Sequence, residues 1–333
     1  MITEDNVLFF SILAAMLPVL FYVGLIYWVD RYEKEPWWLL SAAFVWGAIP
    51  AALLAIISNA VLSAPFYILT DNASADLVSG GFIAPFVEEI AKGLALFAIL
   101  FFWRQELDSP LDGIIYGAMV GMGFAMVENV LYYQAAFIED GQTGWNMVVL
   151  IRGVLFGLSH ALYTAMTGLG IAVARLSANR AVRILAPLAG LSLAIFLHAF
   201  HNLAMFSGTT LGFLAGLSFD WGGLILTAVI IVLALHQERR WMKKYLQEEV
   251  GRGTLSPAEY DLIGSAFRRS RFRLDRLRTG GFSAYRLSGR RFHHCSELAY
   301  RKHHFSIFND DQSREAIKAL RKALAAESSQ LTI

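Results

Sequence analysis

The stretch IAPFVEEIAKGLALFAILFFW, Ile83–Trp103, is long and apolar enough to cross a membrane as a helix, because about 20 such residues span the hydrocarbon core. It nevertheless contains two adjacent glutamates, Glu88 and Glu89, followed by Lys92. A charged side chain near the bilayer centre costs about 2.5–3.5 kcal/mol on insertion scales, and such residues usually mark a site of chemistry or transport. The stretch therefore predicts a membrane helix that carries part of a functional site.

The whole chain has the composition of an integral membrane protein. Its 333 residues are 56% hydrophobic and 13% aromatic, and the one cysteine, Cys295, excludes a disulfide framework. The charges are unevenly distributed: from Gln237 onward there are 20 Lys and Arg against 11 Asp and Glu, and before it 8 against 16. We therefore expect a membrane domain, residues 1–236, followed by a basic tail domain, residues 237–333.

Seven apolar stretches have the length of a membrane helix. They are Val7–Val29, Trp37–Leu62, Ile83–Trp103, Leu111–Phe137, Met147–Ala174, Ile184–Phe206 and Leu211–His236. Pro18, Pro50 and Pro187 are expected to kink or end the helices that contain them. The predicted fold is an all-α polytopic membrane protein with about seven transmembrane helices and a small helical cytoplasmic C-terminal domain.

The basic loop residues fall on one side of these seven spans. The first, third and fifth loops contain Arg31, Lys34, Arg104, Arg175, Arg180 and Arg183, whereas the second, fourth and sixth loops contain no Lys or Arg. By the positive-inside rule, the N-terminus lies outside and the basic tail lies in the cytoplasm. The expected location is therefore the cell membrane.

With this topology, polar residues of four consecutive spans share one depth in the outer half of the membrane. They are Glu88, Glu89, Glu128, Asn129, His160, His198, His201 and Asn202. His198 and Asn202 are four residues apart and can share one helix face. Arg152 is expected to turn outward toward the interface. Asp220 in the last span has no explanation at this level.

Buried glutamates and histidines suit the activation of water. One reading is a glutamate general base assisted by a histidine and an asparagine that stabilise the developing oxyanion. The other is a catalytic zinc site, in which histidines and a glutamate leave one position open for water. The HExxH pattern of many zinc proteases is absent, and the residues alone leave both readings open.

These segments together resemble the PrsW family of intramembrane proteases, which is related to the CAAX prenyl proteases. The resemblance covers most of residues 30–202 and is carried by DRYEKEP (30–36), FVEEIAKGLAL (86–96), GFAMVENVLYY (123–133), FGLSHALYTAMTGLG (156–170) and HAFHN (198–202). Order, spacing and placement within the spans agree, so the match is specific. His201 is additional to the last motif.

The resemblance implies a peptidase that cuts a membrane-anchored protein, typically a regulator such as an anti-sigma factor, on its extracytoplasmic side. Carried over, Glu88 or Glu89 activates water, with Glu128 also at the site. His160 and His198 orient the water or bind a metal, with Glu89 as the third metal ligand. Asn202 polarises the scissile carbonyl. The implied cofactor is zinc in a metalloprotease, whereas the prenyl-protease relatives have been argued to use glutamate without a metal.

The alternative is a non-catalytic scaffold or a proton-coupled transporter that uses the same polar cluster. A proton relay predicts polar groups across both leaflets, whereas these cluster in one, so the protease interpretation is favoured. In the tail, Ser256 and Glu259 predict a helix start, a basic helix follows, and residues 313–325 predict an amphipathic helix. The tail is expected to contact the membrane surface or a cytoplasmic regulator, and no nucleic acid is expected as a partner.

Overall fold

The computed structural model describes residues 2–328 of the chain. Within this range every regular element is helical and there is no strand, which confirms the all-α class. Five helical stretches in it are long and apolar enough to cross a membrane: Val7–Val29, Trp37–Leu69, Pro110–Arg175, Arg180–Phe206 and Thr210–Gly251. Pro110–Arg175 covers two of the expected spans, and the charged stretch with Glu88 is a separate helix, so the number seven stays a prediction.

The described chain forms two compact units. The first contains residues 2–29 and 35–230, and the second contains residues 30–34 and 231–328. The short segment 30–34 thus belongs with the tail rather than with the membrane helices on either side of it.

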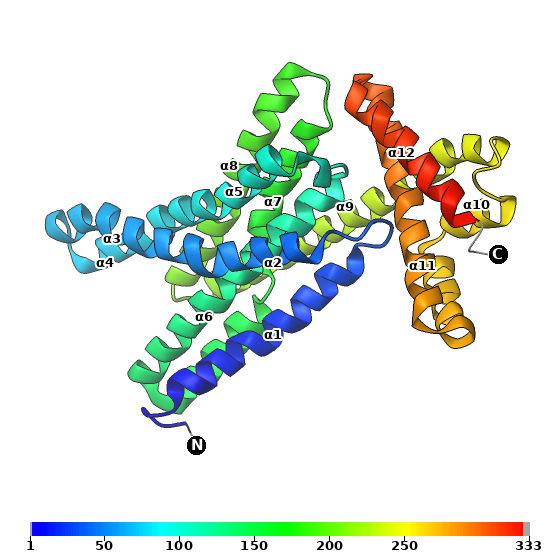
Figure 1. Ribbon diagram of the computed structural model, residues 1–333. Helices are drawn as coiled ribbons and strands as arrows, with labels where there is room; N and C mark the ends of the chain where they lie inside the picture. The colour runs from blue at the N-terminus through cyan, green and yellow to red at the C-terminus, as the bar shows by residue number, and fades with distance from the viewer. Residues whose placement is uncertain (1, 329–333) are drawn as a thin grey trace. The chain divides into compact units, whose positions relative to one another are not determined.

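The helices of the first unit follow the expected spans with several differences at their ends (Figure 1). They are α1 (Val7–Val29), α2 (Trp37–Trp46), α3 (Ala52–Leu69), α4 (Asn72–Val78), α5 (Ala84–Phe102), α6 (Pro110–Val148), α7 (Ser159–Arg175), α8 (Arg180–Phe206) and the first part of α9 (Thr210–Gly251). Pro18 and Pro187 lie inside α1 and α8, which continue through them, whereas Pro50 lies in a π-helical segment, Gly47–Ala51, between α2 and α3. Wider π-helical turns are a common response to a residue that cannot donate its backbone hydrogen bond.

Helix α6 is the centre of the first unit, with α1, α2 and α7 packed around it (Figure 1). Its glycines make this contact very close. A Cβ atom on Gly117 would lie 2.5 Å from the carbonyl oxygen of Thr164, and one on Gly121 would lie 2.2 Å from that of His160. The pair therefore does what a GxxxG spacing allows, bringing two helix backbones together.

The fifth expected span, Met147–Ala174, is not one helix. A π-helical segment, Val149–Leu155, is followed by a break at Phe156–Leu158, and α7 begins at Ser159. Non-helical backbone at membrane depth is tolerated where it lines a cavity, and Phe156 and Gly157 do line one. The break places His160 in the first turn of α7.

The second unit has its own apolar core. Its helices are the end of α9, α10 (Pro257–Ile263), α11 (Ala266–Phe308) and α12 (Asp311–Ser328). Ser256 and Glu259 cap each other's backbone N–H groups at the start of α10, as the sequence predicts. Buried Leu320 and Leu324 of α12 join a core around Cys295 and Leu298 of α11, so the expected amphipathic helix is present.

Candidate active site

Four helices of the first unit bring their polar residues together. Helix α5 supplies the paired glutamates and the lysine, α6 a glutamate and an asparagine, α7 a histidine, and α8 a histidine. These side chains are Glu88, Glu89, Lys92, Glu128, Asn129, His160 and His198, and each is buried or nearly so. Residues separated by more than 100 positions thus form one contiguous polar cluster inside apolar helices.

Glu89 is the most fully bonded carboxylate of the cluster. It is 0% exposed, and one oxygen lies 2.8 Å from Lys92 Nζ and 3.0 Å from His198 Nδ1. Its other oxygen accepts a hydrogen bond of 3.0 Å from the hydroxyl of Thr164. Both oxygens therefore have partners, and Glu89 ties α5 to α7 and α8.

Glu88, one residue earlier, has a different environment. Its Oε2 atom is buried and has no hydrogen-bond partner among the described residues. Lys92 Nζ lies 3.6 Å from this atom and His198 Nε2 lies 3.9 Å from it. A buried carboxylate oxygen without a partner is costly, so this atom is available to a water, a proton or a cation.

His160 links the two glutamate-bearing helices. Its Nδ1 lies 3.1 Å from Lys92 Nζ, and its Nε2 lies 2.7 Å from an oxygen of Glu128. A charged lysine only donates, so Nδ1 accepts and Nε2 carries the proton that is donated to Glu128. The ring also lies 5.0 Å from that of His198, at 89° to it.

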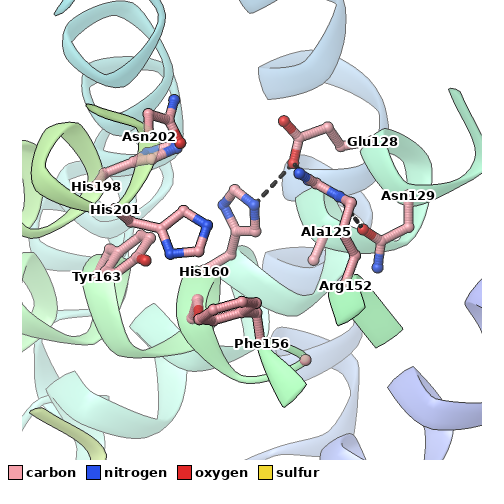
Figure 2. A pocket seen from close by; sticks show the side chains of 12 residues that line it. Ala125, Glu128, Asn129, Arg152, Phe156, His160, Tyr163, His198, His201 and Asn202 are labelled. Atoms are coloured by element: carbon pink, nitrogen blue, oxygen red, sulfur yellow. Dashed lines mark hydrogen bonds and ion pairs between the residues drawn. The ribbon is translucent and has the colours of Figure 1, made fainter. Parts of the chain in front are cut away.

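The prediction that Arg152 turns outward is wrong. Its guanidinium lies 2.6 Å from Glu128 and donates a 3.0 Å hydrogen bond to Asn129, and Figure 2 shows it facing the same space as His160. It also stacks over the ring of Tyr132, 3.7 Å from the centroid. The reason is the partly buried Glu128 carboxylate: leaving it without a cation would cost more free energy than keeping the arginine away from the interface.

A small cavity lies between α6, α7 and α8 (Figure 2). Its wall includes Glu128, Arg152, His160, His198 and Asn202, and water-sized spheres fit in it over about 20 Å³. About 10–15 Å³ of such space holds one water molecule. The cavity therefore has room for a water or an ion but not for a peptide, and a substrate requires some separation of these helices.

The remaining predicted residues of α8 divide between the cavity and its edge. Asn202 lines the cavity, and its amide donates a 2.7 Å hydrogen bond to the carbonyl of Gly80. A side-chain amide has two N–H groups, and this bond uses one of them. His201 also lines the cavity, with Nδ1 2.8 Å from Asp220, at an angle too oblique for a regular hydrogen bond.

Three of these residues fit a metal ion. Glu88, His160 and His198 each offer one donor atom, and these atoms lie within 4.8 Å of one another. The unpartnered oxygen of Glu88 supports this fit, as does the bond from His198 Nδ1 to Glu89, because metal-binding histidines usually bond a carboxylate through their other nitrogen. His160 must give up its contact with either Lys92 or Glu128 before one of its ring nitrogens can bind a metal. The carboxylate in this group is Glu88, whereas Glu89, the glutamate expected as a metal ligand, bonds the Nδ1 atom of His198.

The sequence reasoning missed three contributors: Thr164, Tyr163 and Asp220. Thr164 and Tyr163 follow His160 by four and three residues, a spacing that places them on its helix face. Tyr163 stacks on the His198 ring, with centroids 5.0 Å apart and planes at 23°. Asp220 was visible as a lone acid in a span, but its partners lie on α7 and α8, and no local pattern names them.

Comparison with known proteins agrees with these contacts. The model of the PrsW family of intramembrane metalloproteases matches residues 35–236, which is more than half of the chain. The chain belongs to this family. It is therefore a peptidase of the membrane, and the matched range contains every residue of the polar cluster.

Several curated PrsW proteases are similar to it. The Protease PrsW of Geobacillus kaustophilus is 28% identical over 210 residues, 63% of this chain and 86% of the relative. That of Shouchella clausii is 30% identical over 196 residues, 59% and 83% respectively, and that of Clostridioides difficile 24% over 225 residues, 66% and 85%. No solved structure matches the chain.

Proposed function

We propose that this protease hydrolyses a peptide bond of a membrane-anchored protein, with Glu88, His160 and His198 as its reactive group. The observation that carries the proposal is the buried Glu88 Oε2 atom, which has no hydrogen-bond partner and lies 3.9 Å from His198 Nε2. A carboxylate oxygen free of other bonds and close to a histidine is suited to accept a proton from water.

The neighbouring groups hold this arrangement. Glu89 fixes the ring of His198 through Nδ1, and Lys92 and Glu128 hold His160 from opposite sides. Glu88 takes the proton of the attacking water and then passes it to the leaving amine. Asn202 donates its free N–H to the oxygen of the scissile carbonyl as negative charge develops there.

Zinc is the cofactor that this donor set suits. The residues that would hold it are His160, His198 and one oxygen of Glu88. Such an ion would polarise the carbonyl and make the bound water a stronger acid. If one oxygen of Glu88 held the ion, the other oxygen of the same carboxylate would be left to take the proton from water.

The cleavage is proposed to take place near the extracytoplasmic side, with the N-terminus outside and the tail in the cytoplasm. The support is the charge of the loops, since Arg31, Lys34 and Arg104 fall on the side opposite to acidic Glu139 and Asp140. A regulator such as an anti-sigma factor is the proposed substrate class, by analogy with the family.

The tail is proposed to rest on an anionic membrane surface. In the first half of α11, Phe267 and Leu274 are exposed, and so are Arg268, Arg271 and Arg278 on the same turns of the helix. Apolar side chains flanked by arginines are typical of helices that lie at a lipid headgroup layer.

The proposal is tested by N-terminal proteomics of the host membrane and shed fractions. Wild type is compared with Glu88→Gln and with the exposed control Glu139→Gln, all at equal membrane level. New N-termini near the outer ends of single-pass segments, present with wild type and the control and absent with Glu88→Gln, support it and name the substrate. Identical N-termini with Glu88→Gln would overturn the assignment of the base.

A further inference from the structure

The first part of α9 lies at the edge of the first unit, and one acid points inward from it. Of residues 210–230, only Gly216, Asp220 and Thr227 are buried. Asp220 is 1% exposed and is the sole ionisable residue of that range. An ionisable group kept inside a membrane helix has a partner that explains it.

Asp220 has partners on two other helices. Its Oδ2 atom accepts a 2.5 Å hydrogen bond from the hydroxyl of Ser159, and the hydroxyl of Tyr163 donates to its carboxylate at 2.9 Å and 3.0 Å. His201 Nδ1 lies 2.8 Å from the same Oδ2 atom. Ser159, Tyr163 and His201 all line the cavity, so one carboxylate on α9 bonds two residues of its wall and lies against a third.

The contact continues from Tyr163 to the reactive group. The tyrosine ring stacks on His198, 5.0 Å away and nearly parallel to it. His198 is thus held at one edge by Glu89, through Nδ1, and on one face by a ring whose hydroxyl is bonded to Asp220. The remaining edge, Nε2, faces Glu88.

We infer that Asp220 is a positioning residue, which sets the plane of the His198 ring through its bond to Tyr163. Asp220 does not touch the cavity itself, and its effect reaches the site only through these neighbours. The inference rests on the proposed function for its meaning in catalysis, but its structural part concerns the histidine rings alone.

The test is histidine-selective isotope labelling of the whole chain in liposomes, with solid-state NMR of the ring nitrogens. The chain has eight histidines, and a His198→Gln variant identifies the His198 signals. The variants are Asp220→Asn, which keeps one acceptor oxygen, Asp220→Leu, which keeps none, and Tyr163→Phe, which removes the linking hydroxyl. Thr227→Val, on the same face of α9, is the matched control, because its hydroxyl bonds only the carbonyl of Gly223.

We expect the His198 signals to move in Asp220→Leu and Tyr163→Phe, to move less in Asp220→Asn, and to stay in place in Thr227→Val. The double variant Asp220→Leu/Tyr163→Phe should shift the His198 signals no further than the larger of the two single-variant shifts, because both substitutions interrupt the same chain of contacts. Cleavage of a substrate found by proteomics should fall about 100-fold in Asp220→Leu, the loss that a misplaced catalytic group produces.

Unchanged His198 signals in a folded Tyr163→Phe protein would overturn the inference, and this variant serves even if Asp220→Leu does not fold. A shift of the His198 signals that is equally large in Thr227→Val would overturn it as well. If the signals move as expected but wild type cleaves nothing, the positioning stands and the proposed protease function fails.

Discussion

Substitution by glutamine should have different effects at the two adjacent glutamates: at Glu89 it should mainly lower stability, and at Glu88 it should mainly lower the rate of cleavage. Glu89 has charge-assisted bonds to Lys92 and His198 and a third bond to Thr164, and no part of it is exposed. Removing one member of a buried ion pair costs about 3–5 kcal/mol. The amide oxygen of a glutamine still accepts one bond, so Glu89→Gln should lower the free energy of unfolding by about 3 kcal/mol, the low end of that range.

Glu88→Gln should cost less than about 1 kcal/mol, because neutralising a buried carboxylate without hydrogen bonds relieves part of its desolvation. Lys92 keeps Glu89 as its closer partner, at 2.8 Å rather than 3.6 Å. The same substitution removes the proposed base, so the cleavage rate should fall about 10²–10⁴-fold, the usual contribution of a general base.

The assay has two parts on the same preparations. Unfolding in detergent micelles gives the stability of each variant, and the rate at which the new N-terminus appears in liposomes gives cleavage per folded molecule. Cleavage by Glu88→Gln at the wild-type rate would refute the assignment of the base. Equal stability of the two variants would refute the assignment of Glu89 as the structural carboxylate.

Three further predictions follow from other parts of the molecule. Gly121→Val should separate α6 from α7, because its Cβ would lie 2.2 Å from the His160 carbonyl oxygen. The free energy of unfolding should fall by about 1–3 kcal/mol, and cleavage should be lost. Gly24→Ala is the control, because a Cβ there has nothing within 4 Å. Zinc should bind the purified wild-type protein but not His198→Gln, and elemental analysis and titration calorimetry would measure this. Equal zinc binding by both proteins would contradict the assignment of His198 as a ligand. Burial, and then the charge of Lys244, lowers the pKa of His303 in the tail to about 4. The unfolded histidine binds a proton below about pH 6.5, whereas the folded one binds it only below about pH 4. Tail stability should therefore be full above pH 6.5 and fall as the pH drops toward 4. In His303→Phe, which keeps an aromatic ring against Trp241, thermal unfolding should lose that part of the pH dependence.

Much of the membrane unit could be predicted because its signals are local. Apolar length gives α1 with both ends correct. A GxxxG spacing such as that of Gly117 and Gly121 indicates a close helix contact, although it does not name α7 as the partner. In the tail, the cap at Ser256 is likewise a local pattern of four residues, Ser256–Glu259, and it is present. The break before α7 has no local signal in the sequence. Gly157, within it, packs against Tyr22 of the distant helix α1, where a Cβ would lie 2.5 Å from the ring.

The members of the polar cluster could be chosen from the sequence, but not their pairing. A shared depth selected Glu88, Glu89, Glu128, His160 and His198 together. Thr164 and the rotation of α5 against α7 and α8 decide which glutamate forms hydrogen bonds and which does not. No sequence pattern gives that rotation. For the same reason Arg152 was assigned to the interface, although Glu128 holds it at the cavity.

The charges of the cluster also do not balance, and the imbalance falls on Glu88. Three carboxylates, Glu88, Glu89 and Glu128, are accompanied by two cations, Lys92 and Arg152. The shortest contacts pair Lys92 with Glu89 at 2.8 Å and Arg152 with Glu128 at 2.6 Å, which leaves Glu88 without a cation of its own. A buried, uncompensated charge is costly, so the cluster gains from a proton or a divalent cation at Glu88 and at no other member. The polar contacts that stabilise the helix bundle thus make one carboxylate an acceptor of positive charge, which is what both a general base and a metal ligand must be.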